Sequence, residues 1–109
     1  MRKLRKSNQP VLCSDGFSMS VQASSFTYCY PQVDQEEEIT YISVEVGYPS
    51  EKEDLLIGFA EDRQCPTETV YPYVPVTTVA LVCAKHGGVV SGELPRGVPW
   101  FTPEQCGNP

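Results

Sequence analysis

The chain has 109 residues, which is the length of a single domain with one hydrophobic core. Apolar residues at 40% and charged residues at 20% lie near the averages of folded soluble proteins, so a fibrous or low-complexity chain is excluded. No apolar run approaches the roughly 20 residues that cross a bilayer, and the basic start leads into polar residues instead of a hydrophobic signal core. We therefore expect a soluble, intracellular protein.

The net charge of −6 is unevenly distributed, because four of the eight basic residues lie within the first six positions. Beyond Lys6 the chain has 4 basic and 14 acidic residues, a net charge of −10, with acids concentrated in 34–38 and 51–62. Such a body disfavours direct binding of nucleic acid. It favours a partner protein with a basic surface, although an acidic face also keeps a small protein soluble.

The five cysteines are an odd set, and no two of them lie within four residues of each other. Without a signal sequence this spacing disfavours a disulfide framework, and it lacks the paired ligands of a structural zinc site. We expect reduced thiols, no bound metal and no cofactor.

Two segments near the start predict a β-hairpin. Apolar residues alternate with polar ones through Phe17–Ala23, as in a strand with one buried face. Val11–Cys13 precedes it, and Asp15-Gly16 supplies the turn.

The next segments are richer in aromatic and β-branched residues. Phe26–Tyr30 is expected to be a short strand or a loop, ended by Pro31. Ile39–Val46 predicts a central strand with Ile42, Val44 and Val46 on one face, and with Tyr41, Ser43 and a solvent-facing Glu45 on the other. Leu55–Phe59 predicts a fourth extended segment.

The second half predicts an edge strand followed by a helix. Val70–Val74 is confined to an edge or a bulge because Pro72 has no amide proton to donate. Pro75 can open a helix over Val76–His86, and Gly87-Gly88 supplies the stop signal. Val89-Val90 predicts a short last strand.

These elements predict an α+β fold in which about five mainly antiparallel strands are covered by one helix. We divide the chain into a basic, flexible tail over 1–10, a folded domain over 11–93 and a proline-rich aromatic arm over 94–109. The prolines exclude a regular helix or a central strand in the arm, yet Trp100 and Phe101 give it apolar area. We expect the arm to dock, either on its own domain or on a host protein or a second copy of the chain.

Catalytic signatures are weak. His86 is the only histidine, and its place before Gly87-Gly88 is explained by the helix dipole without any reaction. No Walker-type phosphate loop is present, and no pair of acids is set in an apolar run. We predict a protein that is not an enzyme and has no catalytic residues.

The aromatic residues are better candidates for function. Tyrosine offers a large amphipathic contact area at low entropic cost and is enriched at recognition surfaces, although tyrosines also line the half-buried faces of small sheets. We therefore predict a partner-binding surface made of acidic and aromatic residues, namely Glu36, Glu37, Glu38, Tyr48, Glu51, Asp54, Tyr71, Tyr73, Trp100 and Phe101.

The segments Gly16–Ser24, Tyr28–Pro31, Val44–Ser50, Thr69–Val76 and His86–Gly88 resemble those of small uncharacterised proteins of bacteriophages and prophages. The resemblance covers about Gly16 to Gly88, and Pro72 stands where the family pattern has glycine. The family has no assigned reaction, so the resemblance carries over no catalytic residue. It implies that the protein works in the cytoplasm of a host bacterium.

Four functions follow from these observations. The first is a phage-encoded inhibitor of a host defence or nucleic-acid-processing complex, similar in kind to anti-CRISPR proteins. Its acidic residues would occupy a basic groove of the host complex, and its tyrosines would anchor the contact. The second is a protein that sequesters a nucleotide by stacking on tyrosine with contacts from Arg63, Lys85 or Arg96. The third is a virion assembly protein, and the fourth is an enzyme. We take the first as the main hypothesis.

Overall fold

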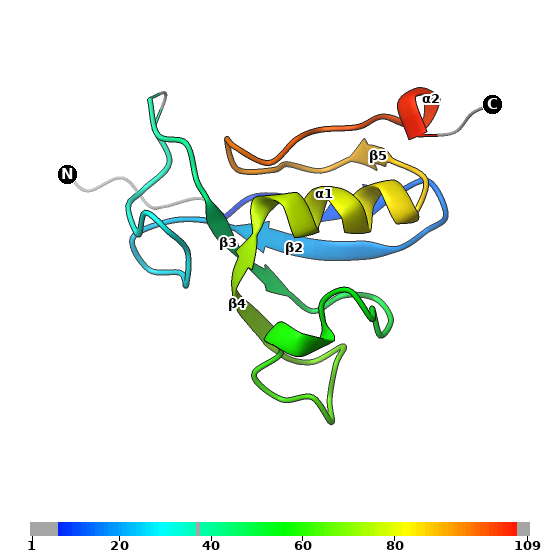
Figure 1. Ribbon diagram of the computed structural model, residues 1–109, viewed down its shortest axis with the longest axis horizontal. Coiled ribbons are helices and arrows are strands. Elements are labelled where there is room, and N and C mark those ends of the chain that lie inside the picture. Colours follow the sequence, from blue (N-terminus) through cyan, green and yellow to red (C-terminus); the bar gives the residue numbers. More distant parts are fainter. Residues whose placement is uncertain (1–6, 37, 107–109) are drawn as a thin grey trace.

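Five antiparallel strands form one sheet in the order β4-β3-β2-β1-β5 (Figure 1). The computed structural model describes residues 7–36 and 38–106, so the predicted basic tail up to Lys6 lies outside the described residues. The elements are β1 (Val11–Cys13), β2 (Ser18–Gln22), β3 (Ser43–Gly47), the 3-10 helix η1 (Ile57–Phe59), β4 (Val70–Pro75), α1 (Val76–Lys85), β5 (Val89–Ser91) and α2 (Pro103–Cys106). The predicted α+β class is confirmed.

Strands β1 and β2 form the predicted hairpin with the predicted turn. Val11 pairs with Met19, and the turn closes where the Phe17 amide donates to the Asp15 carboxylate at 2.9 Å. Just before β1, Asn8 exchanges hydrogen bonds with the side chain of Gln22. Residues 8–10 therefore belong to the folded domain, although the sequence assigned them to a flexible tail.

Strand β3 is central, as predicted, but it is shorter than expected and its first residues face the other way. Tyr41 is only 2% exposed, whereas Ile42 is 63% exposed. The reason is that residues 39–42 precede the sheet: the Tyr41 amide donates to the Arg96 carbonyl and its hydroxyl to the Val33 carbonyl. Regular pairing with β2 and β4 begins only at Ser43.

The prediction of a fourth extended segment over Leu55–Phe59 is wrong. This run forms a turn and η1, because Glu53 organises it. The Glu53 carboxylate accepts the Leu55 amide at 2.9 Å, and the Glu53 carbonyl accepts the next two amides. Capping by one acidic side chain overrides the strand propensity of the apolar residues.

Helix α1 lies across one face of the sheet (Figure 1) and places Val79, Val82 and Cys83 in the core. It ends as predicted, with Gly87 and Gly88 at φ of 91° and 94°, in the region that favours glycine. None of the helices in 7–36 and 38–106 is long and apolar enough to span a membrane.

The C-terminal arm packs on its own domain beside β5. It contains the short helix α2, which begins at Pro103, so the prediction that the prolines exclude a helix there is wrong: a proline is tolerated in the first turn of a helix. The Val89 amide donates to the Phe101 carbonyl, and Val98 is buried against the core. Gly88 lies so close to Thr102 that a Cβ atom there would stand 2.6 Å from the Thr102 carbonyl carbon. The arm is therefore an integral part of the fold.

Candidate partner-binding surface

The predicted acidic residues fall into two separate groups. Glu36 and Glu38 are exposed in the loop before β3, and Glu51 and Asp54 are exposed in the loop after it. Figure 1 shows these loops at opposite ends of β3. Glu37 lies outside the described residues. The acidic residues predicted to act together do not meet in one patch.

The predicted aromatic residues differ in their exposure. The prediction that Tyr71 belongs to the binding surface is wrong. Tyr71 is fully buried on the inner face of β4, and its hydroxyl donates to the Pro66 carbonyl at 2.6 Å. Burial raises the pKa of Tyr71. A partner cannot reach this side chain, whereas Tyr48 and Tyr73 are exposed.

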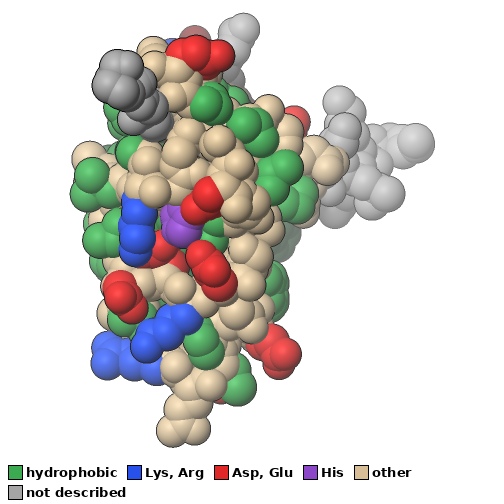
Figure 2. Space-filling model, turned by 90° about the vertical axis from the view of Figure 1, so that its right-hand side faces the viewer, with side chains coloured by type: hydrophobic (Ala, Val, Ile, Leu, Met, Phe, Trp, Pro, Cys, Tyr) green, Lys and Arg blue, Asp and Glu red, His purple; other side chains and the backbone are tan. Residues whose placement is uncertain are grey.

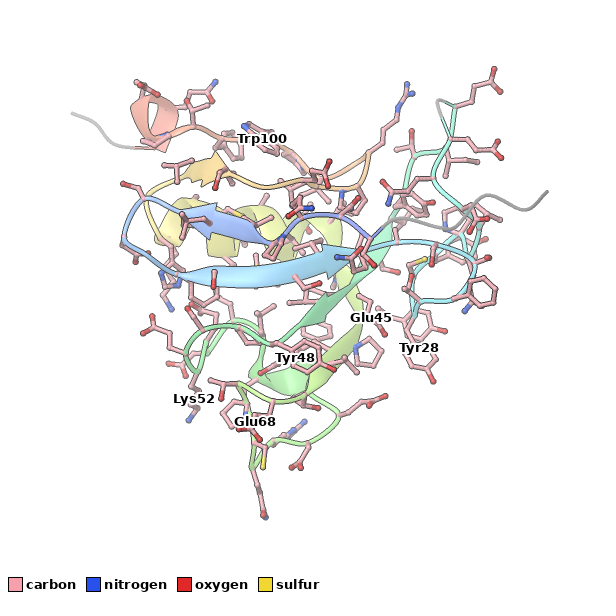
Figure 3. The ribbon with its side chains drawn as sticks, turned by 180° about the vertical axis from the view of Figure 1, so that it is seen from behind. Tyr28, Glu45, Tyr48, Lys52, Glu68 and Trp100 are labelled. Carbon is pink, nitrogen blue, oxygen red and sulfur yellow. The ribbon has the colours of Figure 1, made fainter. Side chains whose placement is uncertain are left out.

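The two aromatic residues of the arm, Trp100 and Phe101, are partly exposed. Figure 3 shows Trp100 next to β5, far from Tyr28. Since Val98 of the same segment is buried, the arm is held by its aliphatic residue and leaves Trp100 and Phe101 about four-tenths exposed.

One group of side chains does come together, and we call it the tyrosine cluster: Tyr28, Glu45 and Tyr73. The rings of Tyr28 and Tyr73 have centroids 5.9 Å apart and are tilted by 45°, and the two residues remain 46% and 50% exposed. Figure 3 shows Tyr28 beside Glu45 on the face of the sheet away from α1.

The backbone of β4 positions Tyr73 in this cluster. The register between β3 and β4 shifts between Val44 and Val46, so an irregularity of β4 lies opposite Glu45. Tyr73, in this irregularity, has φ of 54°, a left-handed conformation that is uncommon for an aromatic residue. Bulges of this kind redirect a side chain. Here the side chain that leaves the strand pattern is the one that meets Tyr28.

The segment 28–30 is held by hydrogen bonds to two strands. The Tyr73 amide donates to the Tyr28 carbonyl at 3.0 Å, and Tyr30 forms an isolated antiparallel bridge with Ser43. Tyr28 is therefore fixed by backbone contacts and does not depend on its own ring for its position. Tyr30 in this segment and Phe26 just before it add exposed aromatic area.

Glu45 is the acidic member of the cluster, and the prediction that it simply faces solvent needs correction. It is partly buried, and burial raises its pKa, as does the nearby Glu61 carboxylate, while the backbone amide of Tyr28 lowers it. Within 7–36 and 38–106 no basic side chain forms an ion pair with Glu45. Glu45 thus lies beside the exposed Tyr28, and no basic side chain in 7–36 and 38–106 pairs with it.

The surface predicted from the sequence did not include Tyr28 or Glu45. Tyr28 lies in a run that was left open between strand and loop, and nothing local shows which strands it reaches. The signal for Tyr73 was Pro72, which predicts irregular pairing at this point of an edge strand.

A second arrangement lies at the opposite end of the domain, where His86 follows α1. Its Nδ1 lies 2.6 Å from Asp15 Oδ2 and its Nε2 lies 2.6 Å from Glu53 Oε1. The second oxygen of Glu53 accepts from Lys85 Nζ at 2.7 Å, and the Phe17 ring stacks on the imidazole at 4.0 Å. Figure 2 shows His86 in purple among acidic and basic side chains.

We call this arrangement the His86 clamp, and its contacts hold three parts of the chain together. Both ring nitrogens face carboxylates, so the imidazolium is the form that satisfies both contacts, and these contacts raise the pKa of His86 against the opposing effect of burial. A protonated imidazole with both N–H groups engaged cannot serve as a general base. The clamp ties the β1–β2 turn and the loop after β3 to the end of α1.

Two of the three basic residues proposed for a nucleotide site make contacts within the domain. Lys85 is engaged by Glu53, and Arg63 reaches the Gly58 carbonyl. In the part of the chain that the structure describes, no group of three or more His, Cys, Asp and Glu side chains is arranged to hold a metal ion.

Comparisons with known proteins give no match to a family model, to a curated protein or to a solved structure.

Proposed function

We propose that this protein is a non-enzymatic binding protein whose tyrosine cluster attaches to a basic surface of a partner protein. The observation that supports this most directly is the exposed pair Tyr28 and Tyr73 beside Glu45, which forms no ion pair with any basic residue of 7–36 and 38–106. Tyrosine anchors surrounded by complementary charge are typical of the energetic centres of protein interfaces.

The acidic body supports the choice of a basic partner. Residues beyond Lys6 carry a net charge of −10, which attracts basic surfaces over about a Debye length and speeds association. Together with the resemblance to phage and prophage proteins, this charge leads us to propose that the partner is a host defence or nucleic-acid-processing complex and that binding inhibits it in the host cytoplasm.

The proposal is tested by binding to purified host nuclease complexes, including guide-loaded CRISPR effectors. We expect nanomolar to micromolar binding that weakens as salt is raised, and inhibition of nucleic-acid cleavage at matching concentrations. The double variant Tyr28→Ser/Tyr73→Ser should lose at least about tenfold in affinity, because each anchor contributes on the order of 1–2 kcal/mol.

Leu81→Ser is the matched control, because Leu81 is an exposed apolar side chain on α1, on the other side of the sheet from the cluster. This variant should bind like the wild type. Absence of binding to every basic effector tested, or equal loss in both variants, would refute the proposed function.

A further inference from the structure

We infer that the tyrosine cluster is a receptor for one arginine side chain of the partner, which stacks on the exposed surface of the Tyr28 and Tyr73 rings and pairs with the Glu45 carboxylate. This inference deepens the proposed function and rests on it for the identity of the partner, but the site itself can be tested without the partner.

The charge at the site calls for a cation. Glu45 is partly buried on β3, and Glu61 lies near enough to act on it electrostatically. The three ion pairs among the described residues all belong to the His86 clamp, so Glu45 is not neutralised by any of them. A partly buried carboxylate without a cation gains more from an incoming positive charge than a solvated surface acid does.

The rings supply the second contact. Tyr28 and Tyr73 each leave about half of their surface exposed, and their centroids are 5.9 Å apart. Cations bind to aromatic faces within about 6 Å of the ring centroid. The Glu45 carboxylate accepts a hydrogen bond from the Tyr28 backbone amide, so a cation that pairs with Glu45 lies next to the residue that carries one of these exposed rings.

The backbone maintains this arrangement at a cost. The left-handed Tyr73, with φ of 54°, is strained for a residue with a Cβ atom, and a strained aromatic residue at an irregularity of an edge strand is more readily explained by a binding role than by stability. Its amide is fixed to the Tyr28 carbonyl at 3.0 Å, which keeps the two rings together before any ligand arrives.

Arginine fits this site better than lysine. A planar guanidinium stacks on an aromatic ring while its N–H groups donate in pairs to a carboxylate, and it is less strongly hydrated than an ammonium group. A lysine can satisfy the carboxylate but lacks the planar contact, so we expect selectivity for arginine.

The test uses the full chain and a defined probe, the capped peptide Gly-Gly-Arg-Gly-Gly, followed by amide chemical shifts in NMR. We expect saturable shifts at the amides of Tyr28, Glu45 and Tyr73 with millimolar affinity, at least several-fold weaker binding of the lysine peptide, and none of the neutral citrulline peptide.

Glu45→Gln should weaken the arginine peptide at least about tenfold, while Glu68→Gln, which removes the same charge from an exposed loop residue, should change affinity less than about twofold. The inference is overturned if shifts concentrate on the acidic loops, if no site saturates by about 20 mM peptide, or if Glu45→Gln binds like Glu68→Gln. A protein that binds the peptide at this site but no nuclease complex would refute the proposed function and leave the arginine site standing. If the protein binds such a complex and Glu45→Gln binds it equally well, the arginine site is refuted and the proposed function stands.

Discussion

Glu53 is the residue whose removal should cost the fold most, because three parts of the chain depend on its carboxylate. It is 1% exposed, accepts from His86 and Lys85 at 2.6 and 2.7 Å, and caps the turn at Leu55. Breaking a buried ion pair by removing one partner costs about 3–5 kcal/mol. Since small domains are stable by about 5–15 kcal/mol, we expect Glu53→Ala to remove a large part of the total stability.

Glu53→Gln separates the charge from the shape. A glutamine oxygen can still accept the Leu55 amide, so the expected loss is smaller, about 1–3 kcal/mol, although His86 then keeps only Asp15 as a negative partner. The variant should also change how stability depends on pH, because one of the two carboxylates that raise the pKa of His86 is gone.

The sign of this dependence follows from proton binding. In the unfolded chain His86 loses its proton near 6.5, whereas the folded state holds it to a higher pH, so the native state binds more protons above 6.5. Wild-type stability is then fully present below about pH 6.5 and falls as pH rises through the raised pKa, by at most about 1.4 kcal/mol per pH unit. Asp15 and Glu53 have lowered pKa values and act at the acid end: their contribution is lost as pH falls through those values.

Urea unfolding at a series of pH values between 5 and 9 tests both expectations, with Glu51→Ala as the control because Glu51 is exposed in the same loop. We expect the control to stay within about 0.5 kcal/mol of the wild type. If Glu53→Ala cost no more than Glu51→Ala, or if wild-type stability were flat between pH 6 and 9, the clamp would not hold the fold.

Three further predictions follow from the backbone and the arm. Tyr73→Asn should keep the free energy of unfolding within about 1 kcal/mol, because asparagine tolerates the left-handed conformation, while binding of the arginine peptide falls; a large loss of stability in thermal unfolding would contradict the strain at this residue. Gly88→Ala should lose more than about 2 kcal/mol in urea unfolding through collision with Thr102, whereas Gly58→Ala, with open space around it, should be nearly neutral. Deleting 94–109 should lower stability by about 3 kcal/mol through loss of Val98 packing, and an unchanged melting temperature would show that the arm contributes nothing.

The sequence predicted those elements that local pattern determines. The hairpin followed from alternation and Asp15-Gly16, and α1 followed from its apolar face and from Gly87-Gly88. The pattern failed where a specific hydrogen bond decides the conformation. The Glu53 carboxylate turns the apolar run after it into a 3-10 helix, and the Arg96 carbonyl in the arm accepts from the Tyr41 amide and holds Tyr41 in the core.

The candidate site shows the same division. Tyr73 was predicted from residue type and its neighbouring proline, but its partners Tyr28 and Glu45 are 45 and 28 residues away along the chain, and only an irregularity in strand pairing brings them together. Tyr71 was misassigned because an irregular edge strand has no fixed alternation that tells inner from outer residues.

The central claim is that the tyrosine cluster contacts a partner protein, and site-specific photocrosslinking in a bacterial host tests it most directly. A photoreactive phenylalanine analogue at position 28 reports contacts of the cluster, and the same analogue at position 81 reports those of the exposed side of α1. The account predicts one crosslinked host protein from position 28 and none from position 81, with the crosslink in a basic segment that contains arginine. No product from position 28, or the same product from both positions, would contradict it.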